Sequence, residues 1–549
     1  MKTLLKKTYR QILNWGDPNY QEVLSDDVKK TIQELVGIPV LEVNLPTFLP
    51  GEKEVVVDRK IQLPPKYVKE FTEIVGAENI KTSDFDRAKH AAGKFYSELL
   101  ELRQEKVTTP PDLVISPNDE SQVELIIQKC NEWKIAICPQ GLRSSVTKGI
   151  GLPDGGIALD LTKHLNQIIH LDEESLTVTA QAGINGPALE KFLNQKGYTC
   201  GHFPQSFEFS TLGGWIAAKG AGQCSTGYGK IEDIVLSLKA FTPIGIFENE
   251  SYPKAAQGWD VMPLFIGAEG TLGVITQATI KIRKFEPNNR RNACIIFKDF
   301  ESAQGSMQAC IQGQFGLPHL FRISDHEETE VAFRMKGFEG SFSDKALQAI
   351  GYKPNSRSLM FISVEGDKDY TSLVIDKIKS TSKKFGGRSI GSRPTKKWLS
   401  QRFHSAYMRE PLMDLGLMTD TIETSVMWKD LKKLWKNVRT YIKSRPNTVC
   451  MCHISHVYEN GANLYFTFIS PTDKSAPLED YQQFHEGLVN TILSNNGSLS
   501  HHHGIGRALS PWLKEKIGEN SYQLMQGIKS IIDPNGIMNP GSVINESNK

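Results

Sequence analysis

The segment that decides the fold reads Gly201-His202-Phe203-Pro204-Gln205-Ser206-Phe207-Glu208-Phe209-Ser210-Thr211-Leu212-Gly213-Gly214. Two further glycine-containing segments lie on either side of it, namely Pro139-Gln140-Gly141-Leu142-Arg143-Ser144-Ser145 and Gly267-Ala268-Glu269-Gly270-Thr271-Leu272-Gly273-Val274-Ile275. Glycine lets backbone N–H groups approach a pyrophosphate closely, and small hydroxyls add donors. Each segment read singly is typical of an ordinary turn. Their order within a single candidate domain favours a shared ligand site.

The sequence around these segments predicts short strands and a few helices. The expected strands cover residues 113–115, 135–137, 156–161, 176–181, 234–242 and 274–282. Asn118 or Asp119 can cap a helix, and a second helix over 185–196 begins with Asn and ends before Gly197. A β-α-β opening followed by β-rich sequence predicts an α+β fold rather than a doubly wound sheet.

Proline-rich and polar joints suggest four regions. Residues 1–105 form a partly helical N-terminal extension that ends in a helix over 84–103, before Thr108-Thr109-Pro110-Pro111. Residues 106–285 form the ligand-binding domain, and the polar run 287–291 marks its end. Residues 286–500 are expected to form a second α+β domain, and residues 501–549 a closing segment.

Composition excludes several classes of protein. The chain has 549 residues, with 39% hydrophobic and 23% charged residues, which excludes a disordered polymer. Its 64 basic and 62 acidic residues give no general reason to expect nucleic acid. The eight cysteines form no C-x-x-C pair, so we expect reduced, mostly buried thiols. The start lacks a secretory apolar run, and Ser547-Asn548-Lys549 is not a peroxisomal address, so we expect an intracellular protein, cytoplasmic or peripherally membrane-associated.

The three segments, in this order, resemble the flavin loops of the FAD-binding oxidases of the vanillyl-alcohol oxidase type. Residues 533–541 resemble the D-P-x-x-x-x-N-P-G ending of that family, and the match runs from about Arg87 to Gly541. Within the family, the chain resembles the alkyldihydroxyacetonephosphate synthases in residues 14–16, 201–211, 229–233, 422–425 and 498–504. The resemblance implies a two-subdomain FAD-binding domain, a cap domain with an antiparallel sheet, and a C-terminal segment that returns to the flavin.

The resemblance also implies where FAD binds. The implied cofactor-binding residues are Pro139, Gln140, Gly141, Leu142, Arg143, Ser144, Ser145, Gln205, Ser206, Phe207, Glu208, Phe209, Ser210, Thr211, Ala218, Lys219, Gly220, Ala221, Glu269, Gly270, Thr271, Leu272, Gly273, Val274 and Ile275. Ser144 stands where some relatives carry a flavin-linking histidine, so the expected FAD is non-covalent. Leu142 and Arg143 replace family glycines, and each would cost about 1–2 kcal/mol if its φ had to be positive. Gln205 replaces an aspartate of the synthases.

Three adjacent histidines, His501, His502 and His503, form the most specific motif. Adjacent side chains cannot all point one way, so at most two can face one pocket. An isolated trio is typical of core and turn histidines, whereas the resemblance implies that this trio lies over the flavin and is needed for activity. Tyr465 lies in an alternating strand, where a tyrosine usually just packs, and the resemblance makes it an acid/base. A phenol with a pKa near 10 needs cationic or hydrogen-bonding neighbours to act as a base, and the histidines could supply them.

Two alternatives to the synthase remain open. Flavin-dependent 2-hydroxy-acid dehydrogenases of the same superfamily commonly bind a divalent metal where this chain has Tyr465 and His502. We therefore expect no metal site, and the difference favours the synthase over the dehydrogenase. A flavin-free binding protein is the other alternative, motivated by Leu142 and Arg143. Arg409, and less directly Arg322, match substrate-binding arginines, although either alone would more often form a structural ion pair.

The function implied by the resemblance is exchange of the acyl group of acyl-dihydroxyacetone phosphate for a long-chain alcohol, without net redox change. The competing function is an FAD-dependent oxidase or dehydrogenase of a 2-hydroxy acid or alcohol. The implied partners are the two lipid substrates, with peripheral membrane contact and a homodimer left open and no nucleic acid.

Overall fold

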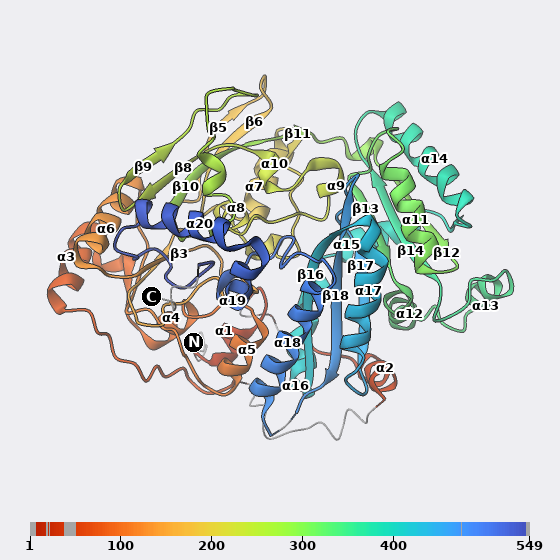
Figure 1. The fold of residues 1–549 in the computed structure, drawn as a ribbon, viewed down its shortest axis with the longest axis horizontal. Helices are drawn as coiled ribbons and strands as arrows, with labels where there is room; N and C mark the ends of the chain where they lie inside the picture. The colour runs from red at the N-terminus through yellow and green to blue at the C-terminus, as the bar shows by residue number, and fades with distance from the viewer. Residues whose placement is uncertain (1–6, 18–19, 21, 38–50, 474, 545–549) are drawn as a thin grey trace, which may run out of the picture.

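The computed structural model describes residues 7–17, 20, 22–37, 51–473 and 475–544. The basic start of the chain as far as Lys6 and the C-terminal Ser547-Asn548-Lys549 lie outside these residues. Helices and sheets are mixed as the sequence predicts, and the sheets are built largely from antiparallel strand pairs. Figure 1 shows the glycine-rich loops and their two sheets in one half of the molecule and a large sheet, drawn in green to blue, in the other half.

The first sheet follows the predicted β-α-β opening. Its strand order is β1 (Ile80–Lys81), β2 (Leu113–Ile115), β4 (Ile157–Asp160) and β3 (Ile137–Gln140). Strands β2, β4 and β3 run parallel, and β1 is antiparallel to β2. Helix α6 (Glu120–Trp133) connects β2 to β3, and the Asp119 side chain caps it by accepting from Gln122 N–H. Strand β3 runs directly into the first glycine-containing loop.

The second sheet is antiparallel throughout, and the third glycine-containing loop runs directly into one of its strands. Its order is β5 (Ile168–Asp172), β6 (Thr177–Gln181), β10 (Val274–Lys281), β8 (Val235–Thr242) and β9 (Gly245–Glu248). The strand predicted over 274–282 is confirmed, whereas β5 and β9 had no clear signal. Asn185 caps α7 (Gly186–Gln195) as predicted. The short elements that complete this half are β7 (Tyr198–Thr199), α8 (Leu212–Ala217), α9 (Ser225–Tyr228), α10 (Ile231–Ile234) and β11 (Arg283–Lys284).

The large sheet has seven antiparallel strands. Their order is β15 (Arg388–Ser389), β12 (Arg291–Phe297), β14 (Ser358–Val364), β13 (Leu320–Ser324), β17 (Val449–Ile454), β18 (Gly461–Pro471) and β16 (Leu417–Met427). One face packs against α11 (Phe300–Ile311), α14 (Lys368–Lys384), α17 (Trp428–Ile442) and α18 (Pro477–Leu493) (Figure 1). The other face meets α12 (His326–Met335), α13 (Phe342–Ala349), α15 (Arg393–Gln401) and α16 (Arg409–Asp414).

Alternation along β18 decides which side chains reach this second face. Leu464, Phe466 and Phe468 are buried in the core beneath the four covering helices. Successive strand residues point to opposite faces, so Tyr465 and Thr467 point the other way, toward the half that contains the glycine-containing loops. In the register of the sheet, Tyr465 pairs with His453 of β17 on one side and with Glu423 of β16 on the other.

The prediction of a single helix over residues 84–103 is wrong, because this stretch forms two helices. These are α4 (Asp84–Lys89) and α5 (Tyr96–Arg103). Between them the backbone passes close to the first loop, where Lys94 N–H donates to the Ser145 carbonyl at 2.6 Å. A Cβ on Gly93 would lie 2.5 Å from the same carbonyl oxygen, so the break needs a glycine. The remaining N-terminal helices are α1 (Tyr9–Leu13), α2 (Asp26–Val36) and α3 (Pro65–Val75).

The C-terminal helices α19 (Gly506–Ile517) and α20 (Glu519–Ile532) return the chain to the half that contains the glycine-containing loops (Figure 1). The following segment pairs with β3, where Ile137 N–H donates to the Ile537 carbonyl at 2.8 Å. All eight cysteines are buried and free, as expected. Within the described part of the chain, no helix is both long enough and apolar enough to cross a membrane.

Candidate active site

A cavity of about 610 Å³ lies between the three loops and the face of the seven-stranded sheet that presents Tyr465. The structure brings most of the sequence-predicted residues to its wall. These are Pro139, Gln140, Gly141, Leu142, Arg143, Ser144, Ser145, Gln205, Ser206, Ser210, Thr211, Ala218, Gly220, Ala221, Glu269, Gly270, Gly273, Ile275, Arg322, Arg409, Tyr465, His502 and His503. Eight others do not line it, namely Phe207, Glu208, Phe209, Lys219, Thr271, Leu272, Val274 and His501.

The loops pack tightly against one another through their glycines. A Cβ on Gly141 would lie 2.4 Å from the Thr211 Oγ1 atom, so the first loop needs glycine where it meets the second. Gly270 has a φ of +75°, and a Cβ there would lie 2.7 Å from Pro139. The three segments therefore form a single cradle in which the backbone, rather than side chains, approaches a ligand.

The unusual residues of the first loop behave differently from each other. Arg143 has a φ of +62°, whereas Leu142 is not among the residues with positive φ. Only Arg143 therefore carries the conformational strain considered above. Its Nη1 donates to the Gly141 carbonyl at 3.1 Å and lies 3.2 Å from His90 Nε2. Gln205 donates from Nε2 to the Arg402 carbonyl at 2.9 Å, so its neutral amide joins the second loop to the large-sheet half.

Polar atoms on the cavity wall are left for a cofactor to bind. Gln140 Oε1 and both ring nitrogens of His202 are buried and have no hydrogen-bond partner among the described residues. Burial lowers the pKa of His202 to about 3, so its imidazole is neutral at pH 7. Because buried polar groups are normally paired, these atoms and the glycine cradle fit a large polar ligand such as FAD.

The histidine trio is held by one carboxylate. Glu423 accepts the backbone N–H of His501 at 2.8 Å, of His502 at 3.1 Å and of His503 at 3.1 Å. Its Oε2 also lies 3.3 Å from His502 Nδ1. Burial opposes ionisation of Glu423, but the neighbouring histidines, His502 above all, lower its pKa well below the ordinary value. His501 turns away from the cavity and pairs through Nε2 with the Tyr458 hydroxyl at 2.6 Å, so two of the three histidines face one pocket.

Tyr465 lies among three imidazoles. Its ring stacks on His453 with centroids 4.7 Å apart, and lies 5.9 Å from His502 and 5.6 Å from His503. The expectation that the histidines would bring its pKa toward neutrality is wrong. Burial raises the pKa of Tyr465 to about 12. The same desolvation lowers the pKa of His503 to about 4 and that of His453 to about 4, so these rings are neutral and cannot stabilise a phenolate.

Both predicted arginines line the cavity, and both already have acidic partners. Arg409 contacts Glu410 Oε1 at 3.1 Å and donates to the Lys94 carbonyl at 2.8 Å. Arg322 pairs with Glu328 and lies over the Trp398 ring at 5.2 Å. The arginines are therefore oriented toward the cavity by contacts that a phosphate would have to share or displace.

Several residues of the site were missed by sequence reasoning. Glu423 lies in a stretch that supported the resemblance, but nothing in it indicated three backbone contacts to the trio. His453, His456 and His202 also line the cavity. Their positions depend on strand pairing and loop packing between distant segments, for which single residues carry no sequence signal.

Comparisons with known proteins agree with this geometry. A family model described as "FAD binding domain" matches residues 111–249, and one described as "FAD linked oxidases, C-terminal domain" matches residues 286–543. The alkyldihydroxyacetonephosphate synthase of Dictyostelium discoideum is 31% identical over 98% of this chain and 94% of its own. A solved alkyldihydroxyacetonephosphate synthase superposes with a TM-score of 0.75 at 29% identity, covering 88% of this chain and 86% of the other.

The matched models and the loop cradle define an FAD-binding flavoprotein. A solved p-cresol methylhydroxylase shares the fold, with a TM-score of 0.68 at 15% identity, over 88% of this chain and 97% of the other. More narrowly, the chain belongs to the family of the alkyldihydroxyacetonephosphate synthases. It is therefore an FAD-dependent enzyme of this family.

Proposed function

We propose that this chain exchanges the acyl group of acyl-dihydroxyacetone phosphate for a long-chain alcohol, giving an ether-linked product without net redox change. The observation that carries the proposal is the position of Tyr465 beside His502 and His503 in the cavity that the flavin loops line. FAD, when bound in the cradle, would supply the flavin ring on which the exchange depends. The predicted cofactor-binding residues on the cavity wall would hold it.

The reaction needs a proton to leave and return at one carbon. That carbon lies between the ketone and the ester oxygen, which makes its C–H acidic. The electron pair left by the proton is one that bound flavin would hold until the proton returns. The bond from this carbon to the ester oxygen breaks with its own pair on the departing carboxylate, and the alcohol oxygen then bonds to the same carbon. The alcohol proton must go to a group of the enzyme, and the carbon must regain the proton that it lost.

Tyr465 is assigned the acid/base role, with the histidines as its proton relay. Because its pKa is raised to about 12, Tyr465 holds its proton at neutral pH and is a donor in the resting enzyme. Because the neutral imidazoles do not stabilise a free phenolate, Tyr465 accepts a proton only while it passes its own proton to a neighbouring imidazole in the same step. His503, whose burial lowers its pKa to about 4, is neutral and available as an acceptor, and the His502 ring lies 5.9 Å from the phenol ring, centroid to centroid.

The arginines are proposed to hold the phosphate of the substrate. Arg409 and Arg322 both reach the cavity wall, and guanidinium groups bind two phosphate oxygens at once. Glu410 and Glu328 hold these arginines before substrate binds. Burial would raise the pKa of Glu328, but Arg322 and His453 lower it to about 2, so Arg322 keeps an ionised partner at neutral pH.

One end of the cavity has a wall suited to a lipid chain. Apolar side chains from α2, α12, α16 and the ends of β17 and β18 line it, namely Ile32, Leu35, Met335, Leu412, Met451 and Ile469. Burial of each methylene there is worth about 0.8 kcal/mol, which favours a long alkyl or acyl chain over a small hydroxy acid. Because both substrates are lipids, the proposal includes peripheral contact with a membrane.

The proposed division of the chain follows the predicted regions. The FAD-binding domain is assigned to residues 106–285 and the substrate-binding cap to residues 286–500. The extension 1–105 precedes these two domains and the segment 501–549 follows them. The segment 501–549 begins with the histidine trio.

The proposal is tested by two assays on the purified protein. The first incubates the flavin-loaded enzyme with acyl-dihydroxyacetone phosphate and an isotope-labelled fatty alcohol, and we expect labelled ether product with no oxidant consumed. The second adds a simple 2-hydroxy acid under anaerobic conditions and follows the flavin absorbance, which we expect to stay unbleached. Bleaching without ether product would support the oxidase or dehydrogenase instead.

A further inference from the structure

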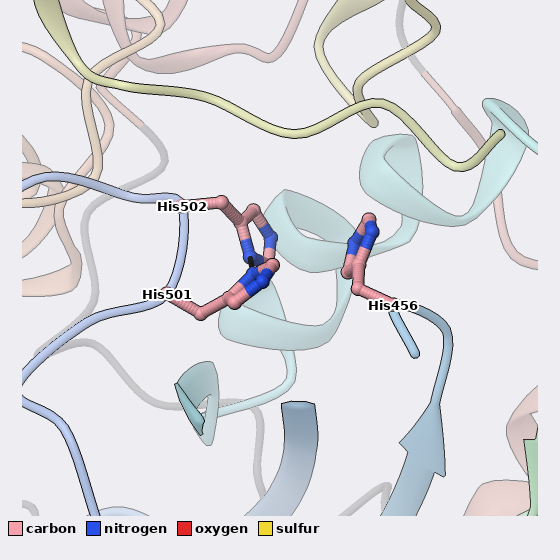
Figure 2. Close-up of side chains that lie close together, drawn as sticks. All are labelled: His456, His501 and His502. Carbon is pink, nitrogen blue, oxygen red and sulfur yellow. Dashed lines mark hydrogen bonds between the residues drawn. The ribbon is translucent and has the colours of Figure 1, made fainter. Parts of the chain in front are cut away.

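We propose that His456, His501 and His502 form a binding site for a divalent late transition-metal ion, of which Zn²⁺ is the typical member. Each of the three offers one ring nitrogen, and these nitrogens all lie within 4.8 Å of one another. Figure 2 shows the three side chains converging, with His501 and His502 on one loop and His456 after the end of β17. The sequence comparison that predicted no metal site considered positions 465 and 502. It could not detect this group, because His456 and His501 lie at other positions.

The outer nitrogens of two of these rings are already held by hydroxyl groups. His456 Nδ1 lies 2.6 Å from the Ser225 Oγ atom, and His501 Nε2 lies 2.6 Å from the Tyr458 hydroxyl. Metal-binding histidines typically have the second ring nitrogen fixed in this way, which orients the first toward the ion. His456 Nε2 and His501 Nδ1 therefore remain available to bind an ion between the three rings.

The spacing of the nitrogens suits a tetrahedral ion after a small adjustment. His501 Nδ1 and His502 Nδ1 are 3.0 Å apart. Tetrahedral Zn–N bonds of about 2.0–2.1 Å place two ligand nitrogens roughly 3.3 Å apart, close to this separation. All three nitrogens lie within 4.8 Å of one another, so at most a small inward movement of the His456 ring completes the ligand triangle. Because His456 and His502 line the cavity, a fourth position can open toward a water molecule or a substrate oxygen.

One charge beside this point favours a bound cation and another opposes it, because the Lys230 ammonium donates to the His501 carbonyl at 2.8 Å. His456 and His501 are 3% and 8% exposed, and burial favours the neutral imidazole, the form that binds a metal. The buried Glu423 carboxylate lies 3.3 Å from His502 Nδ1 and supplies a negative charge beside the site. Three imidazoles with no thiolate favour zinc, copper or nickel over calcium or magnesium.

The site has a consequence that rests on the proposed function. A metal bound to His502 would occupy the nitrogen that faces Glu423 and remove this ring from the proton relay beside Tyr465. Zn²⁺ is therefore expected to inhibit ether formation reversibly, with activity restored by a chelator. Metal binding itself does not depend on the identity of the substrate.

Binding is measured by calorimetric titration of Zn²⁺ into the chelator-treated, FAD-loaded protein. We expect one ion per chain, and affinity at least tenfold weaker in both His456→Ala and His501→Ala, which remove ligands from two different segments. His503→Ala removes an adjacent histidine outside the group, and His170→Ala removes an exposed one; both should bind as the unaltered protein does. Circular dichroism and flavin content check that each variant is folded.

Absence of stoichiometric binding by the unaltered protein would overturn the site. So would equal affinity in folded His456→Ala or His501→Ala protein. Failure of the proposed function would look different, because zinc would still bind with the same dependence on the variants while metal-free protein formed no ether product.

Discussion

Glu423 Oε2 lies 3.3 Å from His502 Nδ1, and the same carboxylate accepts the backbone N–H of His502 through its other oxygen. Through Glu423, strand β16 thereby holds the backbone of the loop that carries the trio and places a negative charge beside its imidazoles. The contact joins the sheet that presents Tyr465 to the segment that presents the histidines. The geometry of the proposed relay depends on this single buried acid.

Replacing Glu423 with Gln should therefore destabilise the protein although the two side chains have the same shape. The amide oxygen can still accept hydrogen bonds from the backbone N–H groups of the trio. The negative charge is lost, however, and the new amide NH₂ group faces an N–H donor with which it cannot pair. We expect a loss of about 2 kcal/mol, seen as a thermal midpoint lowered by roughly 2 °C if the 549 residues unfold as one unit. Glu301→Gln, which removes an exposed pair with Lys432, is the matched control and should change stability by less than about 0.5 kcal/mol. Equal effects of the two changes would contradict this account.

The contact between the first and second flavin loops predicts a defect in Gly141→Ala. The added Cβ would lie 2.4 Å from Thr211 Oγ1, and such overpacking costs typically about 1–3 kcal/mol. We expect weaker FAD binding, measured by flavin fluorescence during titration of the apoprotein. Gly527→Ala in α20, where a Cβ meets nothing within 4 Å, should bind FAD normally. Undiminished FAD affinity in Gly141→Ala would show that the loops do not meet in this way.

The positive φ of Arg143 predicts a difference between two small replacements. Both Arg143→Gly and Arg143→Ala lose the contacts of the guanidinium with His90 and Gly141. Only glycine adopts a φ of +62° without strain, so the glycine variant should be more stable than the alanine variant by about 1 kcal/mol. Thermal unfolding of the two variants measures the difference. An alanine variant as stable as the glycine variant would mean that the loop is not held in this conformation.

The sequence predicted the loops, most strands and the helix caps, because these depend on local chemistry. Asp119 and Asn185 cap the helices that follow them, and the alternation in 274–282 is typical of a half-buried strand. The break near Gly93 was missed because its cause is the distant Ser145 carbonyl. The titration of Tyr465 was misjudged for a similar reason. The sequence indicates His502 and His503 as its neighbours but not His453, and the burial that keeps His453 and His503 neutral depends on the packing of a whole sheet.

Buried Lys94 predicts a pH dependence of stability. Its Nζ donates to the carbonyls of Leu13 at 3.2 Å and Asn14 at 2.7 Å, and burial lowers its pKa to about 7. Between pH 7 and 10.5 the unfolded chain binds the proton more tightly than the folded one, so this lysine makes stability rise with pH by at most about 1.4 kcal/mol per unit.

The change Lys94→Met should remove that contribution. The stability of the unaltered protein relative to the variant should increase between pH 7.5 and 9.5, measured by urea unfolding at each pH. The exposed Lys432→Met serves as the control, with an expected difference independent of pH. Parallel pH profiles for Lys94→Met and the unaltered protein would show that Lys94 titrates normally.

The most direct test of the central claim is the rate of ether formation by Tyr465→Phe. This change removes the phenolic hydroxyl while keeping the ring that stacks on His453, and Tyr441→Phe, which removes a hydroxyl outside the cavity, is its control. With FAD content and spectrum unchanged, we expect the rate of labelled ether formation by Tyr465→Phe to fall by at least about 100-fold. Tyr441→Phe should retain the normal rate. Full turnover by flavin-loaded Tyr465→Phe would contradict the assignment of Tyr465 as the acid/base.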